Sequence, residues 1–501
     1  MKDKILVLDY GTTALKAVLY DGDFNAVCVK SFEFCYSYPA PNHIEYPAER
    51  YIEAAQELLA QIVSEQDCGG EIAALTVTGQ AETLISVDKQ GNVLGNAIVW
   101  TDTRAIDEVQ YLSQQIPSDE YYGVTGISGL DPVVPLAKIM WIKKHLPRQY
   151  ERTDKFLMLH DFVVWKLSGV IGGEKSVYAC SGYLDIRRQE YCRKFLDIAS
   201  IDINKLPPLS DAEQIMGELV PEFAAAIGVK DALVINGMLD QCASAIGCGN
   251  ITPGTVCETT GTVLAIAATL PGFEPESFPS PVIVLPHGLK GRYLALPYCP
   301  TAGILLKWYK DNFLLSDLEK CRNSGKDIYT LINEEIEKRG APITDLIVLP
   351  HFNGYLSPVS NPDAVGVMYG LKLDTDRFQV AHAVMEGIAF LLRENLELLE
   401  RSGIKTESVI SLGGGAKSEL WLHLKSDICH TEFVTMANEE STSLGCALGA
   451  ALAAGMLKSE DDIYKYTAVK NRYVPDGDRL KKYEGKYQKY LELNRRLGFC
   501  D

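Results

Sequence analysis

Leu8-Asp9-Tyr10-Gly11-Thr12-Thr13-Ala14-Leu15-Lys16 is the stretch of sequence that decides the fold. It joins two apolar runs, residues 4–7 and 17–20, which predict a pair of antiparallel strands. The link carries an acid, a glycine and two hydroxyls, and no helix-forming run follows it. Such a hairpin offers backbone N–H groups and hydroxyls to phosphate oxygens, with Asp9 facing a hydrated Mg²⁺. A plain hairpin has the same letters, so the phosphate interpretation depends on the rest of the chain.

A second hairpin of the same design follows in the second half of the chain. Residues 254–267 read Gly-Thr-Val-Cys-Glu-Thr-Thr-Gly-Thr-Val-Leu-Ala-Ile-Ala, again a strand, a Gly/Thr turn and a strand. Elsewhere, apolar strand-like runs alternate with amphipathic helical ones, which favours an α/β fold. The repeat indicates an internal duplication with two similar lobes, residues 1–247 and 248–501, that face a central cleft.

Asp240 stands between the two hairpins. The apolar strand-like run 234–239 ends directly before it, and a segment of small residues able to form a helix follows. An acid at such a junction can project into a cleft between lobes. The alternative is that Asp240 only caps the helix, because aspartate is common at that position.

The composition restricts the class of protein and the partners that we expect. The 501 residues are 47% hydrophobic and 23% charged, as in soluble globular proteins. The formal net charge of −18 argues against nucleic acid or an anionic membrane as partner, but a local pocket of amides and Mg²⁺ still allows ATP. The 13 cysteines form no C-x-x-C pair, which predicts reduced thiols in the cytoplasm. Neither a signal peptide nor a membrane span is expected, and a homodimer is the one protein assembly that the sequence leaves open.

A third glycine cluster requires comparison with the known nucleotide motifs. Residues 408–412 predict a strand, and residues 413–418 read Gly-Gly-Gly-Ala-Lys-Ser before a helix. A P-loop needs glycines where this chain has Ala416 and Ser411, and the Rossmann spacing fails at Ser418. What remains is a strand–glycine–helix turn, which either lets a flat or anionic ligand approach the backbone or serves only for tight packing.

These segments together resemble the FGGY carbohydrate kinases, within the actin/hexokinase/Hsp70 superfamily. The most specific piece is residues 366–371, Gly-Val-Met-Tyr-Gly-Leu, followed after seven residues by Gln-Val-Ala-His-Ala-Val-Met-Glu at 379–386. Residues 135–145 resemble the N-terminal signature of the family, although Val133 departs from its usual opening residue. The resemblance implies two ribonuclease-H-like (actin-like ATPase) domains around a hinged cleft. It also implies ATP- and Mg²⁺-dependent phosphorylation of a sugar or polyol.

The resemblance assigns roles to individual residues. Asp240 matches the catalytic aspartate and is expected to be the general base, and Asp9, together with Asp240, matches the site of Mg²⁺ held through water. The expected substrate contacts are Asp240 with Gln80, Ala81, Glu82, Trp100, Asp102 and Gln241. The expected ATP contacts are Gly11, Thr12, Thr13 and Lys16 along the phosphates, Gly261 and Thr262 facing them, Gly303 in the wall, and Gly414, Gly415, Ala416 and Lys417 or Ser418 around the adenosine.

Other motif residues are expected to be structural. Residues 378–401 have the apolar periodicity of an amphipathic helix that ends before Gly403. Lys138 and Trp141 favour a scaffold role over chemistry, and His160 is expected to be a hydrogen-bonded structural imidazole.

The residues after Gln80 bear on the substrate. Members similar to xylulose kinases usually carry Met-His-Gly there, and glycerol kinases usually carry Arg-Glu-Thr. This chain has Ala81, Glu82 and Thr83, so it lacks both the imidazole and the guanidinium. A carboxylate suits a neutral ketose or polyol better than a sugar acid, which it would repel. We expect a pentulose such as xylulose, with glycerol or another short polyol as the alternative.

Two rival classes use the same fold. One is a sugar-independent ATPase similar to actin or Hsp70, and the substrate motifs at residues 80–83 and 100–104 argue against it. The other is a non-catalytic sugar sensor, which has no need for both Asp9 and Asp240. A dehydrogenase is the least favoured, because the Rossmann spacing fails.

Overall fold

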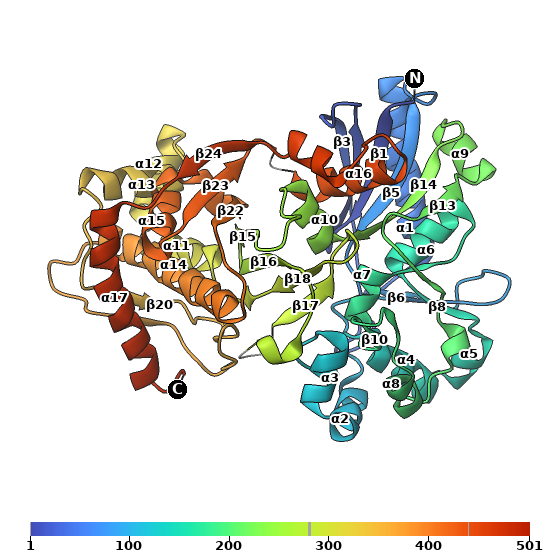
Figure 1. Cartoon of the computed structure of the whole chain (residues 1–501), viewed down its shortest axis with the longest axis horizontal. Coiled ribbons are helices and arrows are strands. Elements are labelled where there is room, and N and C mark those ends of the chain that lie inside the picture. Colours follow the sequence, from blue (N-terminus) through green and yellow to red (C-terminus); the bar gives the residue numbers. More distant parts are fainter. Residues whose placement is uncertain (1, 279–281, 439, 501) are drawn as a thin grey trace.

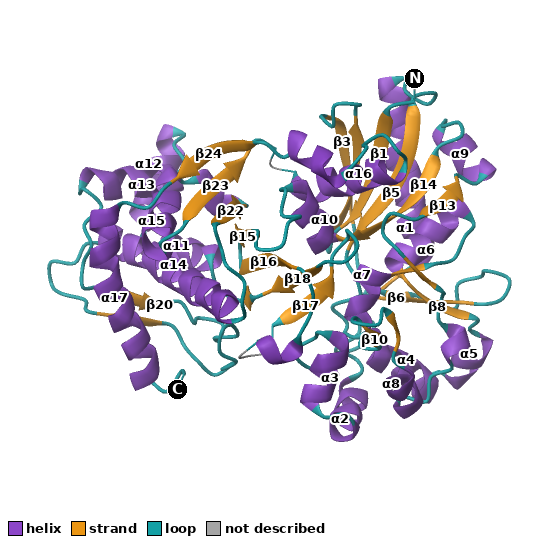
Figure 2. Cartoon of the chain, in the orientation of Figure 1, coloured by secondary structure: helices purple, strands orange, loops and turns teal. Residues whose placement is uncertain are grey.

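The computed structural model describes residues 2–278, 282–438 and 440–500, and it places two mixed sheets in neighbouring lobes (Figures 1 and 2). We call the lobe around the N-terminal sheet the first lobe and the other the second lobe. The first lies on the right of Figure 1 and the second on the left. Within the described residues, every helix is too short or too polar to cross a membrane.

The sheet of the first lobe is built around the predicted hairpin. Its strand order is β13-β14-β5-β1-β2-β3, and Asp9 pairs with Lys16 across the hairpin. β1 is antiparallel to β2 and parallel to β5, which is parallel to β14. The bounds are β1 (Lys4–Tyr10), β2 (Ala14–Tyr20), β3 (Ala26–Glu33), β5 (Ile72–Gly79), β13 (Ile215–Glu218) and β14 (Leu233–Leu239).

The sheet of the second lobe repeats this arrangement. β15 is antiparallel to β16 and parallel to β22, which is parallel to β23. The repeated directions confirm the predicted α/β fold with two ribonuclease-H-like lobes. The bounds are β15 (Val256–Thr260), β16 (Leu264–Leu270), β17 (Ile283–Pro286), β18 (Tyr293–Leu296), β19 (Tyr298–Cys299), β22 (Ser408–Leu412), β23 (Glu432–Met436) and β24 (Val469–Tyr473).

Two helices cross between the lobes. α10 (Asp240–Gly247) follows the first sheet, and α16 (Ser441–Ala453) follows β23 but packs on β1, β5 and β14 (Figure 1). Glycines allow the close crossing, because a Cβ on Gly247 would lie 1.8 Å from the carbonyl oxygen of Ser441. A Cβ on Gly445 would lie 1.8 Å from that of Ala243. The crossing therefore packs a helix from the second half of the chain against the sheet of the first lobe.

The core of the first lobe lies on both faces of its sheet. Because successive strand residues point to opposite faces, Leu6 and Leu8 pack on the face that α1 (Ala48–Gln66) covers, and Ile5 and Val7 pack on the face that α16 covers. A small sheet beside it carries the expected substrate loops. Its strands are β4 (Glu45–Tyr46), β7 (Ala97–Ile98), β6 (Leu84–Val87) and β8 (Lys155–Met158).

Helices complete both lobes. α14 (Arg377–Arg401) confirms the predicted amphipathic helix, and Asp376 caps it by accepting hydrogen bonds from the backbone N–H groups of Phe378 and Gln379. The others in the first lobe include α2 (Ile106–Gln115), α3 (Ser118–Thr125), α4 (Pro135–His145), α5 (Pro147–Arg152), α6 (Leu159–Ser168), α7 (Lys175–Tyr178), α8 (Arg193–Ile198) and α9 (Pro221–Ile227). The second lobe adds α11 (Gly303–Phe313), α12 (Leu315–Ser324), α13 (Ile328–Lys338), α15 (Glu419–Cys429), α17 (Gly477–Arg496) and the hairpin of β20 (Ile347–Leu349) and β21 (Val367–Tyr369).

Candidate active site

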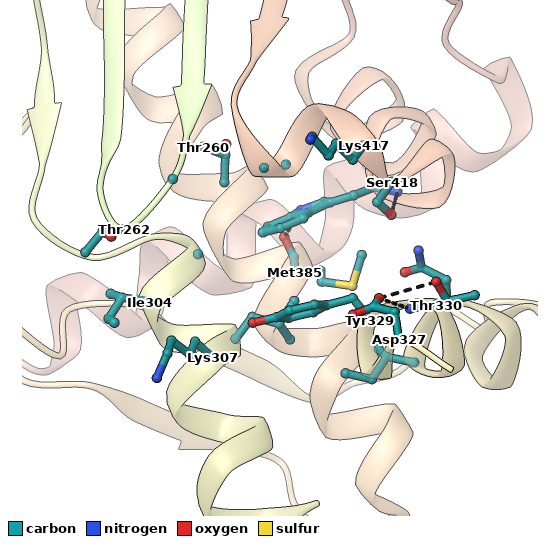
Figure 3. Close-up of a pocket in the computed structure, with 18 residues that line it drawn as sticks. Thr260, Thr262, Ile304, Lys307, Asp327, Tyr329, Thr330, Met385, Lys417 and Ser418 are labelled. Carbon is teal, nitrogen blue, oxygen red and sulfur yellow. Dashed lines mark hydrogen bonds between the residues drawn. The ribbon is translucent and has the colours of Figure 1, made fainter. Parts of the chain in front are cut away.

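A cavity of about 520 Å³ opens in the second lobe, where the β15–β16 turn, the start of α11 and the glycine turn after β22 meet (Figure 3). This volume is within the range of small-molecule sites. Of the residues expected to contact ATP, the cavity is lined by Gly261, Thr262, Gly303, Gly414, Gly415 and Lys417, with Ser418 beside them. Ala416 lies in the same turn but does not line the cavity, and residues 11–16 belong to the first lobe.

Glycines let the turns around the cavity approach one another. A Cβ on Gly303 would lie 2.4 Å from the carbonyl oxygen of Gly261, and a Cβ on Gly415 would lie 2.6 Å from the Cβ of Thr260. Both distances are shorter than any ordinary contact, so these positions exclude a side chain. The glycines expected to bind a ligand therefore also bring the β15–β16 turn, α11 and the turn after β22 together.

Aromatic and apolar side chains that the sequence did not indicate complete the cavity. Tyr329, near the start of α13, lies opposite Thr260 and Lys417 in Figure 3. Trp421 also lines the cavity, and its indole Nε1 donates a hydrogen bond of 3.1 Å to the carbonyl oxygen of Met385. A large aromatic and apolar surface beside backbone turns suits a flat heterocycle such as a nucleobase.

Asp9 and Asp240 occupy the ends of parallel strands in the first lobe. Asp9 is near the end of β1 and Asp240 directly follows β14, and β5 lies between these two strands. Burial, together with the negative charge of Asp9, raises the pKa of Asp240 to about 7. Burial also raises the pKa of Asp9, while the Lys16 ammonium acts in the opposite direction. The two carboxylates therefore repel each other in a shielded place.

The first hairpin turn is fixed by bonds from neighbouring side chains. Tyr36 donates a hydrogen bond of 2.6 Å to the carbonyl oxygen of Thr12, and Gln80 Nε2 donates one of 3.0 Å to that of Gly11. The side chains of Thr12 and Thr13 stay exposed. Lys16 Nζ lies 2.7 Å from Glu440 Oε2, so an ion pair joins the hairpin to the residue that precedes α16.

The loops that carry the expected substrate contacts are held by Lys138 of α4. Its fully buried ammonium donates hydrogen bonds of 3.0 Å to the carbonyl oxygens of Glu82 and Val99, and one of 3.2 Å to that of Trp100. Glu82 has φ of 66°, an uncommon conformation for a residue with a side chain. Burial raises the pKa of Glu82 and lowers that of Lys138. Lys138 thus has the expected scaffold role, and its three bonds join the two loops that carry Glu82 and Trp100.

The other residues expected to contact the substrate differ in the hydrogen bonds that they form within the protein. Gln80 uses both ends of its amide within the protein, because its Oε1 also accepts from Thr83 Oγ1 at 2.7 Å. Asp102 is fully buried and bonds the Arg104 guanidinium and a backbone N–H. In contrast, Trp100 Nε1 is buried and lacks a hydrogen-bond partner among the described residues. Ala81 is buried, and Gln241 is exposed beside Asp240.

A buried network behind Asp240 was not indicated by the sequence. The backbone N–H of Leu239 donates a hydrogen bond of 3.0 Å to Ser176 Oγ, and the Ser176 hydroxyl donates to Glu174. These bonds fix the residue that precedes Asp240. His160 is also buried, but both its ring nitrogens lack a hydrogen-bond partner in the described part of the chain, so the expected hydrogen-bonded imidazole is not observed.

Comparisons with known proteins agree with this geometry. Family models match over residues 4–247, the N-terminal domain of the FGGY family of carbohydrate kinases, and over residues 255–454, its C-terminal domain. The chain is 26% identical to a xylulose kinase of Bacillus subtilis (strain 168), covering 98% of this chain and 96% of that protein. It is 27% identical to a glycerol kinase of Saccharolobus islandicus, covering 94% and 92%.

Solved structures share the fold. The ligand-bound xylulose kinase from Lactobacillus acidophilus has 24% sequence identity and a TM-score of 0.87, covering 99% of this chain and 98% of that one. The Plasmodium falciparum glycerol kinase with ADP has 22% identity and a TM-score of 0.85, covering 98% and 97%. A gluconate kinase from Lactobacillus acidophilus, at 24% identity, has a TM-score of 0.86 and covers 99% and 98%.

Proposed function

The chain belongs to the FGGY family of carbohydrate kinases, and on this basis we propose that it transfers the γ-phosphoryl group of ATP to a hydroxyl of a pentulose such as xylulose. The family establishes a carbohydrate kinase, and the choice of sugar is our inference. Both the xylulose kinase and the glycerol kinase relatives cover more than nine-tenths of the chain, so full-length similarity alone does not decide between these substrates.

The observation that carries the proposal is the environment of Asp240. A general base is most effective when its pKa is close to the working pH, and the pKa of Asp240 is raised to about 7. In phosphoryl transfer, a base near the acceptor accepts the proton as the hydroxyl oxygen attacks the phosphorus. We therefore assign Asp240 as the base, with Ser176 and Glu174 fixing the backbone that carries it.

The nucleotide is proposed to lie in the cavity of the second lobe. Tyr329 and Trp421 provide apolar surface for the adenine, next to the turn formed by Gly414, Gly415, Ala416 and Lys417. The phosphates then extend past Gly261 and Thr262 toward the first hairpin, where Gly11, Thr12, Thr13 and Lys16 present backbone N–H groups, hydroxyls and an ammonium. In this arrangement Lys16 exchanges its bond to Glu440 for a phosphate oxygen.

The acids also suit a hydrated Mg²⁺. Burial raises the pKa of both Asp9 and Asp240, the negative charge of Asp9 adds to the shift of Asp240, and a divalent cation beside them would relieve that repulsion. We propose that these two carboxylates hold the ion through water, because Mg²⁺ keeps several waters when it binds few protein ligands. The ion would neutralise charge on the phosphates of ATP.

The sugar is proposed to bind on the first lobe, near Glu82, Trp100 and Gln241. The half-buried Glu82 carboxyl can bond hydroxyls, and the unpartnered Trp100 Nε1 can donate to a sugar oxygen. A carboxylate-bearing sugar would meet Glu82 unfavourably, which favours a neutral ketose. Glycerol or another short polyol is the second candidate, because Glu82 and Thr83 match the residues that glycerol kinases usually carry after the glutamine.

These assignments give each lobe a different role. We propose that residues 1–247 form the domain that binds the sugar and presents the first phosphate hairpin, and that residues 248–501 form the nucleotide-binding domain. The connection is at the end of α10, which begins with the proposed base.

The test is ADP release in the presence of Mg-ATP and one candidate acceptor at a time. We expect strong stimulation by a pentulose such as xylulose, weaker stimulation by glycerol and short polyols, and none by gluconate. Detection of the phosphorylated sugar by mass spectrometry identifies the product. ATP hydrolysis that every acceptor leaves unchanged would instead identify a sugar-independent ATPase.

A further inference from the structure

A buried ion pair lies directly behind the cavity of the second lobe. Lys425 of α15 places its Nζ 2.6 Å from Glu258 Oε1 of β15, and neither side chain is exposed to solvent. Removing two charges from water is costly, and their attraction offsets that cost only when the remaining hydrogen-bonding positions are also filled. Such a pair is weak evidence for stability by itself, so its partners decide what it does.

Those partners belong to the cavity wall. Thr260 Oγ1, which lines the cavity side of β15, accepts a hydrogen bond of 2.8 Å from Lys425 Nζ and donates one of 2.7 Å to Glu258 Oε2. The hydroxyl of Ser411 on β22 donates to the other oxygen of Glu258. The network therefore joins β15, β22 and α15, the three elements from which the two glycine turns emerge.

The network also touches both turns. Thr260 directly precedes Gly261, and a Cβ on Gly415 would lie 2.6 Å from the Cβ of Thr260 and 3.2 Å from Lys425 Nζ. Gly415 is thus packed against the threonine and the ammonium together. Lys425 Nζ lies 5.1 Å from the ring centroid of Trp421, which lines the same cavity. A shift of the ion pair would move each of these groups.

We propose that Glu258 and Lys425 are positioning residues for the nucleotide. Through Thr260, Gly415 and Trp421 they set the spacing between the Gly261 turn and the Gly414–Gly415 turn, and hence the affinity for ATP. Neither residue lines the cavity, so both would act on a ligand there only through their neighbours. Charge-assisted hydrogen bonds suit this role because they are shorter and stronger than neutral ones. This inference rests on the proposed use of the cavity for ATP.

The test is a double-mutant cycle with Glu258→Gln and Lys425→Gln. Each single change leaves a buried charge without its counter-charge, whereas the double change leaves a neutral amide pair that can still share hydrogen bonds. Because displacements of about 1 Å can cost about 100-fold, we expect each single variant to raise the KM for ATP by at least about tenfold. The KM for the sugar is expected to stay unchanged, and the double variant to recover much of the affinity for ATP.

Lys486→Gln provides a matched control. Lys486 of α17 is also a buried lysine of the second lobe, but its ammonium bonds the buried carboxylate of Glu386, whereas that of Lys425 also bonds Thr260 in the cavity wall. We expect it to lower the melting temperature and to leave the KM for ATP unchanged. If it weakens ATP as much as Lys425→Gln does, the effect is general destabilisation and the proposal is wrong.

If the single variants Glu258→Gln and Lys425→Gln do not fold, a milder variant still tests the proposal. Ser411→Ala removes one hydrogen bond from Glu258 without leaving a charge unpaired. We expect weaker ATP binding in this folded variant, measured by calorimetry with ATP alone. Unchanged ATP binding in Ser411→Ala, or in the folded single variants, overturns the proposal. Because this readout needs no sugar, a wild-type protein that binds ATP but phosphorylates no sugar would refute the proposed function and leave this test valid.

Discussion

At the scale of single residues, the environment of Asp240 disfavours the ionised form of its carboxyl, and we propose that the reaction makes use of this. Its carboxyl is half-buried and is repelled by the negative charge of Asp9, so the ionised form is disfavoured and the pKa rises to about 7. The same shift makes Asp240 an effective proton acceptor near neutral pH. In the proposed mechanism, the environment that destabilises the ionised carboxyl also makes it reactive, which is a common property of active sites.

The raised pKa predicts how activity depends on pH. A base acts only when deprotonated, so kcat/KM for the sugar should fall as the pH is lowered, and Mg²⁺ beside Asp240 should shift this fall below the pKa of about 7 that the carboxyl has without the ion. The same carboxyl has its usual pKa when the chain is unfolded, so its contribution to stability is lost as the pH rises toward 7. The pH profile of kcat/KM under constant ionic strength measures the first effect. A profile that stays flat from about pH 8 down to about pH 4, the usual pKa of an aspartate, would remove Asp240 from the rate-determining proton transfer.

Lys138 supports a second prediction at this scale. Lys138→Met removes the donor that joins the carbonyl oxygens of Glu82, Val99 and Trp100, and leaves all three without this bond. We expect a higher KM for the sugar with the KM for ATP unchanged, and a loss of about 3 kcal/mol in the free energy of unfolding. Urea unfolding and steady-state kinetics measure both. The exposed Lys143 on the same helix provides the control, because Lys143→Met should leave the KM for the sugar unchanged.

At the scale of elements, the crossing of α10 and α16 depends on glycine. A Cβ on Gly445 would overlap the carbonyl oxygen of Ala243, and backbone atoms in two packed helices cannot move aside cheaply. Gly485, in the middle of α17, is a matched contrast because a Cβ there would meet no atom within 4 Å.

These two glycines predict opposite effects of the same substitution. Gly445→Ala should lower the free energy of unfolding by at least about 2 kcal/mol and reduce activity, because the helices between the lobes must separate. Gly485→Ala should raise it by about 0.5–1 kcal/mol, since alanine is the better helix former. Chemical unfolding of both variants tests the pair. Equal stability of the two variants would mean that the crossing adjusts without cost.

The elements also show what the sequence can and cannot predict. Both hairpins, α14 and the position of Asp240 follow from patterns within a few residues, because strand alternation and turn chemistry are local. Tyr329, Met385 and Trp421 belong to three helices that meet only in the tertiary structure, so no local pattern indicates that they share a cavity. Glu258 lies inside the second hairpin, but its partner Lys425 is 167 residues further along the chain, and only the fold brings them together.

At the scale of the whole molecule, the proposed function depends on the two repeated hairpins. One lies in each lobe, and a nucleotide in the second lobe would extend its phosphates toward the first, where Asp9 and Asp240 are located. The net charge of −18 does not oppose this, because backbone N–H groups, Lys16 and Mg²⁺ would act locally on the phosphates. Closure of the lobes should exclude water, which otherwise competes with the sugar for the phosphoryl group.

The central claim is that Asp240 takes the proton from the sugar hydroxyl as the phosphoryl group is transferred. The most direct measurement is the rate of sugar phosphate formation by Asp240→Asn at saturating Mg-ATP and pentulose, with sugar binding followed separately by calorimetry. We expect a rate lower by about 10²- to 10⁴-fold while the sugar still binds. A variant that binds the sugar and turns over within about tenfold of the wild-type rate would contradict it.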